Sequence, residues 1–119
     1  MANTALITGS TGGLGSCFVR IHGEKGGDMI LVGTSEEKLL AQKKEVEEKY
    51  KVRAEYIMAD LSDPMQVENV YDTCKRNGWQ VDVLINNAGF GGQGDFARER
   101  TMQQDMSMLR SFSLFFVQA

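Results

Sequence analysis

Eight residues near the amino terminus have the types and spacing of a phosphate-binding loop. Residues 8–15 read Thr-Gly-Ser-Thr-Gly-Gly-Leu-Gly and separate an apolar run from a segment with helical spacing. At such a junction, glycines let the backbone approach a diphosphate, and the free N–H groups of the following helix attract its negative charge. A flexible turn with incidental glycines is the alternative, which the strand before the loop and the helix after it disfavour. The sequence therefore predicts that this loop binds the phosphates of a cofactor.

Three further groups of residues follow apolar runs. They are Gly33-Thr34-Ser35, Asp60-Leu61 and Asn86-Asn87-Ala88-Gly89. In an open parallel sheet, ligands bind at the carboxyl ends of the strands near the point where the strand order reverses, so these groups are expected to converge on the glycine-rich loop. For Asn86 the alternative role is structural, because a buried amide must find partners and can tie neighbouring strands together.

The strands that position these residues are predicted from short apolar runs that alternate with helical patterns. The candidates are residues 4–8, 29–32, 53–59 and 81–85. Nearly continuous apolar runs are typical of parallel strands that are buried on both faces. The alternation predicts repeated β-α-β units, and hence an α/β fold with a Rossmann-like, doubly wound parallel sheet in the order 3-2-1-4, truncated after about four strands.

The first two helices are predicted from apolar spacing and from capping residues. The pair Gly26-Gly27 ends the first helix. The second is expected to begin at Thr34, which forms a capping box with Glu37, and to continue to about residue 50. The expected inward face of the first helix consists of Leu14, Cys17, Phe18 and Ile21.

Two more helices are predicted later in the chain. The third begins near Pro64 with Asp63 as its cap, because proline is pre-organised for a first helical turn. The fourth is expected from about Glu99 toward the carboxyl terminus. The inward stripe of the third helix is predicted to be Val67, Val70, Tyr71 and Cys74.

Length and composition describe one globular domain. The chain has 119 residues, of which 42% are hydrophobic and 24% charged, and we expect residues 1–119 to form a single nucleotide-binding domain. The net charge of −3 argues against a nucleic-acid partner, because phosphate neutralisation needs clustered lysine and arginine.

Neither a metal site nor a membrane segment is expected. Cys17 and Cys74 lack the spacing of a zinc site or a disulfide framework, which indicates a reducing compartment. His22 is expected at the surface of the first helix. The amino terminus has no basic signal region, and the apolar residues 112–117 are too few to span a bilayer, so we expect a cytoplasmic protein.

Taken together, the motifs resemble the amino-terminal half of a short-chain dehydrogenase/reductase. The glycine-rich loop reproduces the family's Thr-Gly-x-x-x-Gly-x-Gly motif, and residues 86–89 reproduce its Asn-Asn-Ala-Gly. Asp60 matches the acidic residue that follows the third strand in this family. The three landmarks occur in the family's order, and the resemblance extends to about residue 110.

The resemblance implies a nicotinamide dinucleotide site. Asp60 would accept a hydrogen bond from the adenine amino group, and residues 87–89 would lie along the adenine-side ribose. An acidic residue after the second strand would bind the ribose 2′-hydroxyl, but Thr34 and Ser35 stand there, which favours NADP over NAD. The predicted cofactor-binding residues are Gly9, Ser10, Thr11, Gly13, Leu14, Gly15, Thr34, Ser35, Asp60, Leu61, Asn87, Ala88 and Gly89.

The family's catalytic residues are absent from this sequence. The resemblance implies a serine and then Tyr-x-x-x-Lys after Asn-Asn-Ala-Gly, but no tyrosine follows Asn87. Tyr71 and Lys75 have the required spacing, yet they precede that motif, and Tyr71 is expected to pack in the core. Asp105 stands where the family has an asparagine that holds a water, and a carboxylate cannot donate a hydrogen bond as an amide does.

We therefore expect the NAD(P)-binding portion of a short-chain dehydrogenase/reductase. Its parent activity is hydride transfer between NADP(H) and an alcohol or carbonyl compound, in a chain that is itself inactive. A non-catalytic dinucleotide-binding or interaction module is the alternative. S-adenosylmethionine binding is disfavoured, because that fold expects an acidic residue where Gly33 and Thr34 stand.

Homo-oligomerisation is also expected. Residues 81–85 would form an apolar sheet edge beside an apolar tail, and exposed sheet edges and large apolar patches favour association with another chain.

Overall fold

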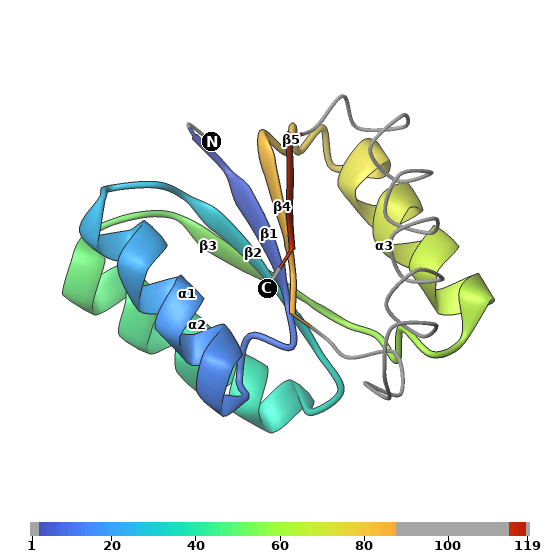
Figure 1. Cartoon of the computed structure of the whole chain (residues 1–119), viewed down its shortest axis with the longest axis horizontal. Coiled ribbons are helices and arrows are strands. Elements are labelled where there is room, and N and C mark those ends of the chain that lie inside the picture. Colours follow the sequence, from blue (N-terminus) through green and yellow to red (C-terminus); the bar gives the residue numbers. More distant parts are fainter. Residues whose placement is uncertain (1–2, 88–114, 119) are drawn as a thin grey trace.

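A parallel sheet carries helices on both of its faces. The structure is a computed structural model, and it describes residues 3–87 and 115–118. The strands are β1 (Ala5–Thr8), β2 (Met29–Gly33), β3 (Ala54–Met58), β4 (Val83–Asn86) and β5 (Phe115–Gln118), and the helices are α1 (Gly13–Glu24), α2 (Glu36–Tyr50) and α3 (Pro64–Arg76). Figure 1 shows α1 and α2 on one side of the sheet and α3 on the other.

The predicted strand order is confirmed. The sheet runs β3-β2-β1-β4-β5, and every neighbouring pair is parallel. The chain moves outward from β1 to β3 and then returns to the other side of β1 with β4, which places the reversal of strand order at β1.

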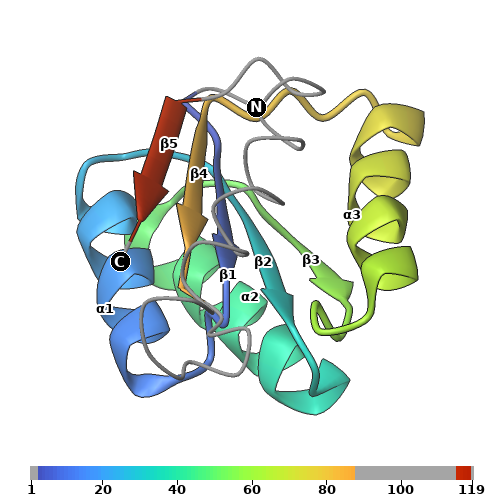
Figure 2. The same cartoon turned by 45° about the vertical axis from the view of Figure 1, so that its right-hand side comes forward.

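The fifth strand corrects the sequence prediction. Residues 115–118 form β5 beside β4, where a helix was expected, while residues 99–114 lie outside the described part of the chain. Aromatic and β-branched residues such as Phe115, Phe116 and Val117 favour strands, and β4 offers N–H and C=O groups that require partners. The expectation that residues 81–85 form a bare edge is therefore wrong, because β5 pairs with β4 (Figure 2).

Two apolar layers hold the helices on the sheet. Alternation along β1 sends Leu6 to the layer under α3, while Ala5 and Ile7 belong to the layer under α1 and α2. Val70 and Cys74 of α3 are fully buried against the first layer, and Leu39 of α2 against the second. The two layers together support the strands from both sides, as expected for a doubly wound sheet.

The predicted inward face of α1 is wrong except for Phe18, which is half-buried and packs against the layer under α1 and α2. Leu14 and Ile21 are 57% and 43% exposed, whereas Val19 is 4% and His22 8% exposed. The helix turns Gly15 and Gly23 inward because these positions have no room for a side chain, and a Cβ on Gly23 would lie 2.4 Å from the Tyr50 ring. The helix ends as predicted, since Gly26 adopts a φ of +77° just beyond it.

His22 is a buried structural residue rather than a surface one. Its Nε2 lies 2.8 Å from the carbonyl oxygen of Asn3 and 3.0 Å from that of Asp28. A protonated Nε2 donates to both, so the ring ties the end of α1 to the residues that lead into β1 and β2.

The caps of α2 and α3 decide where each helix begins. Ser35, not Thr34, is the cap of α2, and its hydroxyl accepts a hydrogen bond from the N–H of Lys38 at 3.4 Å. Asp63 caps α3 as predicted, with Oδ1 accepting from the N–H of Met65 at 3.0 Å.

Candidate functional site

The glycine-rich loop lies at the point where the strand order reverses. It connects the carboxyl end of β1 to α1, and β1 is flanked by β2 on one side and by β4 on the other. The ends of β2 and β4 carry two of the three other groups predicted to join the site, and the third, Asp60-Leu61, follows β3. This edge of the sheet is the general ligand-binding position of open α/β sheets.

A hydrogen-bond network joins the glycine-rich loop to the end of β4. The Thr8 hydroxyl donates to Asn86 Oδ1 at 2.9 Å and accepts from the N–H of Asn87 at 2.9 Å. Asn87 Nδ2 donates to the carbonyl oxygen of Gly9 at 3.3 Å. Asn86 is 4% exposed, so the predicted role of its amide as a tie between strands is confirmed. The network sets the distance between the loop and Asn87.

Two glycines are required by the conformation of the loop itself. Gly9 has a φ of +61°, in the left-handed region that favours glycine. A Cβ on Gly15 would lie 1.9 Å from the carbonyl oxygen of Gly9 and 2.9 Å from Asn87 Nδ2. The first turn of α1 can therefore pack against the loop only with glycine at position 15.

Gly13, the remaining glycine of the motif, has open space around it. A Cβ on Gly13 would meet no atom within 4 Å, so the fold does not require glycine there. The open space lies at the amino-terminal end of α1, where backbone N–H groups lack intrahelical acceptors. Gly12, the cap of α1, has no side chain to satisfy them, and residues 13–16 include no acidic side chain. The residues present therefore fit an anionic group such as a diphosphate.

Residues after β2 lie at the start of α2. Thr34 is exposed, and Ser35 is half-buried with its hydroxyl engaged as the helix cap. Lys38 is exposed one turn further along, and its ammonium has no partner in the described part of the chain. The end of β2 thus offers hydroxyl groups and one cation, with no acidic side chain among Gly33, Thr34 and Ser35.

The residues after β3 divide into an exposed carboxylate and a buried side chain. Asp60 Oδ1 accepts from Ser62 Oγ at 2.7 Å and from the Ser62 N–H at 3.0 Å. These two bonds stabilise the ionised form and lower the pKa of Asp60 below its ordinary value. Leu61 is 8% exposed and belongs to the layer under α3, so its side chain is a core residue.

Several predicted site residues lie outside the described part of the chain. Ala88 and Gly89, which follow Asn87, and Asp105, which stands at the family's asparagine position, are in this group. Their assigned roles stay predictions.

Tyr71 and Lys75 form a pair on α3 away from the site. The Lys75 ammonium lies 5.8 Å from the centre of the Tyr71 ring, and Tyr71 is half-buried rather than part of the core as expected. Tyr71 follows Asp63, the cap of α3, by eight residues, which is about 12 Å along a helix. The pair is therefore separated from the carboxyl ends of the strands.

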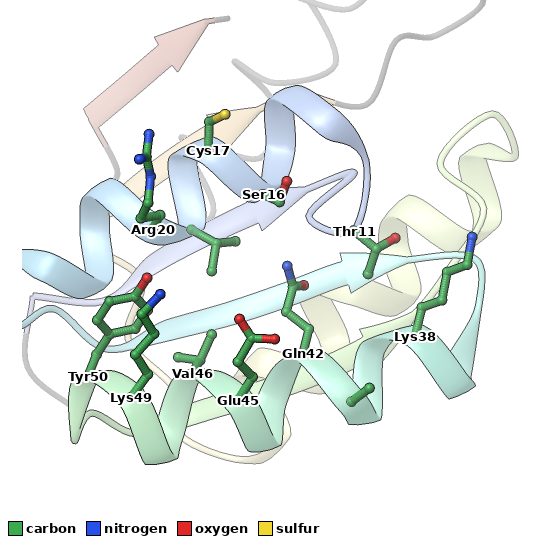
Figure 3. A pocket seen from close by; sticks show the side chains of 12 residues that line it. Thr11, Ser16, Cys17, Arg20, Lys38, Gln42, Glu45, Val46, Lys49 and Tyr50 are labelled. Carbon is green, nitrogen blue, oxygen red and sulfur yellow. The ribbon is translucent and has the colours of Figure 1, made fainter.

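A groove between α1 and α2 was not predicted from the sequence. Its volume is about 460 Å³. Figure 3 shows Gln42 on α2 pointing into the groove, with Thr11 and Lys38 toward one end of it. Gln42 Nε2 donates to the carbonyl oxygen of Ser10 at 2.8 Å, across 32 positions of sequence. The only sequence signal was the four-residue spacing from Lys38, which places Gln42 on the same face of α2.

Metal-binding clusters and membrane-spanning helices are both absent from the described residues. Residues 3–87 and 115–118 contain no cluster of three or more histidine, cysteine or acidic side chains that could hold a metal ion. Within the same residues, none of the helices is long and apolar enough to cross a membrane.

The family comparison covers nearly the whole chain. Residues 3–117 match the family model described as short chain dehydrogenase. The chain is 33% identical over 87 residues to hydroxysteroid dehydrogenase-like protein 1 from Gallus gallus, across 71% of this chain and 25% of that protein. It is 32% identical over 87 residues to the very-long-chain 3-oxoacyl-CoA reductase from Homo sapiens, across 71% of this chain and 27% of that protein.

A solved structure gives the same picture. A blue fluorescent protein from a metagenomic library, in complex with NADPH, superposes with a TM-score of 0.74 at 29% identity, over 94% of this chain and 50% of the other. The match therefore spans about a quarter of the length of these curated relatives and about half of the solved chain.

Proposed function

The chain belongs to the short-chain dehydrogenase family, and from that premise we propose that residues 1–119 form its dinucleotide-binding domain, with NADP(H) as the preferred ligand. One observation carries the proposal. The glycine-rich loop is bonded to Asn87 while Gly13 leaves the first turn of α1 open. The backbone N–H groups of that turn would bind the diphosphate.

The other predicted residues take roles around this centre. Thr34 and Lys38 would face the adenine-side ribose, where an ammonium stabilises a 2′-phosphate and an aspartate would repel it. Asp60 would accept from the adenine amino group through its ionised carboxylate, which the two hydrogen bonds from Ser62 stabilise. The NADPH carried by the blue fluorescent protein supports the same ligand class.

The parent activity that we propose is hydride transfer between NADP(H) and an alcohol or carbonyl compound. A bound nicotinamide supplies or accepts the hydride. This chain's described residues bind the nucleotide, while no tyrosine follows Asn87 to move the accompanying proton. We therefore propose that residues 1–119 by themselves bind the dinucleotide without turning over a substrate, which leaves a non-catalytic binding module as the second candidate.

Calorimetric titration tests the ligand. We expect NADP to bind at least about tenfold more tightly than NAD, a difference of roughly 1.4 kcal/mol. Gly13→Val should weaken both, because its side chain would fill space that the fold leaves open at the start of α1. Thr34→Asp should reverse the preference between NADP and NAD, while Thr34→Ser serves as its neutral control. Tighter binding of NAD by the unmodified chain would contradict the proposed preference.

We also propose that the chain forms homo-oligomers, now through β5 and not through residues 81–85. β5 rather than β4 is the outer strand of the described sheet on this side, so its N–H and C=O groups are the ones left to pair with a second copy. Light scattering coupled to size exclusion should give at least twice the mass of one chain at high micromolar concentration. A monomer under these conditions would contradict it.

We also propose a reducing compartment, namely the cytoplasm. Both cysteines are free thiols, with Cys17 exposed and Cys74 buried. Burial raises the pKa of the Cys74 thiol to about 12, which keeps it un-ionised and unreactive.

A further inference from the structure

Gln42 holds one residue of the glycine-rich loop from the side of α2. Its Nε2 donates to the carbonyl oxygen of Ser10 at 2.8 Å. On the other side, the Ser10 N–H donates to the carbonyl oxygen of Val32 in β2 at 3.3 Å. Ser10 itself is fully buried, so these two bonds, to separate elements, determine where the loop backbone lies.

The other end of the Gln42 side chain is unsatisfied. Its Oε1 is buried and has no hydrogen-bond partner among the described residues. Buried acceptors without partners are rare, because each loses its hydrogen bonds to water on folding. A side chain at this position that served stability alone would therefore be apolar, and the amide points to a role for its donor.

The position of Gln42 connects the two halves of the proposed site. Gln42 follows Lys38 by one helical turn, so both lie on the same face of α2. Both line the groove between α1 and α2 together with Thr11 (Figure 3). α2 thus carries the cation at the ribose end and, one turn later, the donor that contacts the diphosphate loop.

We propose that Gln42 is a positioning residue for the dinucleotide site, which it serves by holding the Ser10 carbonyl and thereby the loop backbone that presents N–H groups to the diphosphate. The inference rests on the proposed function and deepens it. Gln42 acts through the loop and does not itself contact the phosphates.

Gln42→Met is the first test, since methionine keeps the length and volume of the side chain and removes the donor. We expect NADPH to bind about three- to tenfold more weakly by fluorescence titration. The midpoint of thermal unfolding should stay nearly unchanged, because the substitution removes one unpaired acceptor, Oε1, and creates another at Ser10. In the protein without nucleotide, amide hydrogen exchange of residues 9–15 should become faster.

Two charged variants separate the donor from the volume of the side chain. Gln42→Glu offers only acceptors at neutral pH and should weaken NADPH binding more than Gln42→Met does. Gln42→Lys restores a donor that can reach the Ser10 carbonyl, and should bind NADPH at least as tightly as the unmodified chain. If Gln42 only filled space, Gln42→Met would bind NADPH normally and Gln42→Lys would bind it most weakly.

Gln80→Met is the matched control, because Gln80 is exposed before β4 and its side chain makes no hydrogen bond to the residues that the structure describes. It should change neither NADPH affinity nor exchange in residues 9–15. Unchanged affinity or unchanged loop exchange in Gln42→Met would overturn the positioning role while leaving the proposed function intact. Failure of the unmodified chain to bind NADPH would overturn the proposed function, and the positioning role with it.

Discussion

Gly15→Ala should strongly weaken dinucleotide binding and destabilise the fold at the same time. The added Cβ would lie 1.9 Å from the Gly9 carbonyl oxygen, a backbone atom that cannot rotate away as a flexible side chain could. Overpacking of this kind costs about 1–3 kcal/mol of the free energy of unfolding, and we expect the upper end. The displaced loop would also lose one or two charge-assisted bonds to the diphosphate, so NADPH affinity should fall about 100-fold.

Gly13→Val provides the control for this prediction. Its Cβ meets no atom within 4 Å, so the free energy of unfolding should hardly change while NADPH affinity falls. Thermal unfolding and fluorescence titration of the two variants therefore separate a glycine required by the fold from a glycine required by the ligand. A stable Gly15→Ala protein that binds NADPH normally would show that the loop has another conformation in solution.

The polypeptide of these 119 residues should show no measurable dehydrogenase turnover. Proton transfer must accompany hydride transfer, and a positioned general acid or base contributes about 10² to 10⁴ in rate. No tyrosine or lysine follows Asn87, and Tyr71 stands mid-way along α3, away from the carboxyl ends of the strands. Oxidation of NADPH, followed at 340 nm against a panel of carbonyl compounds, should remain at background.

Tyr71→Phe is the decisive variant for this prediction. The substitution should alter neither NADPH affinity nor the background rate, because the ring remains and only its hydroxyl is lost. Robust turnover that Tyr71→Phe abolishes would identify Tyr71 and Lys75 as the reacting pair, against the separation that α3 imposes.

The main residues of the site could be predicted from short segments of the sequence. A glycine-rich segment between an apolar run and a helical pattern defines a β-α junction, and Asp63-Pro64 defines the start of α3, because both depend only on near neighbours. Alternation of strands and helices with right-handed crossovers then leads to the order 3-2-1-4. Asn86 and Asn87 could be placed beside the loop for the same reason.

The sequence could not say which face of α1 is buried or what holds the loop. Its apolar residues favour Leu14 and Ile21, but the glycine-rich loop approaches Gly15 and the Tyr50 ring approaches Gly23 so closely that both glycines must turn inward, which buries Val19 and His22. The sequence also did not show that residues 115–118 form a strand, because that conformation depends on their pairing with β4.

The sequence by itself determined the α/β class, the order of the first four strands and the residues at their carboxyl ends. Those features follow from periodicity and from the backbone freedom of glycine, which are properties of short segments. Only the tertiary structure decided that Asn87 and Gln42 both bond the glycine-rich loop, across 78 and 32 positions of sequence. Such bonds depend on how helices pack on the sheet, and no local spacing encodes that distance.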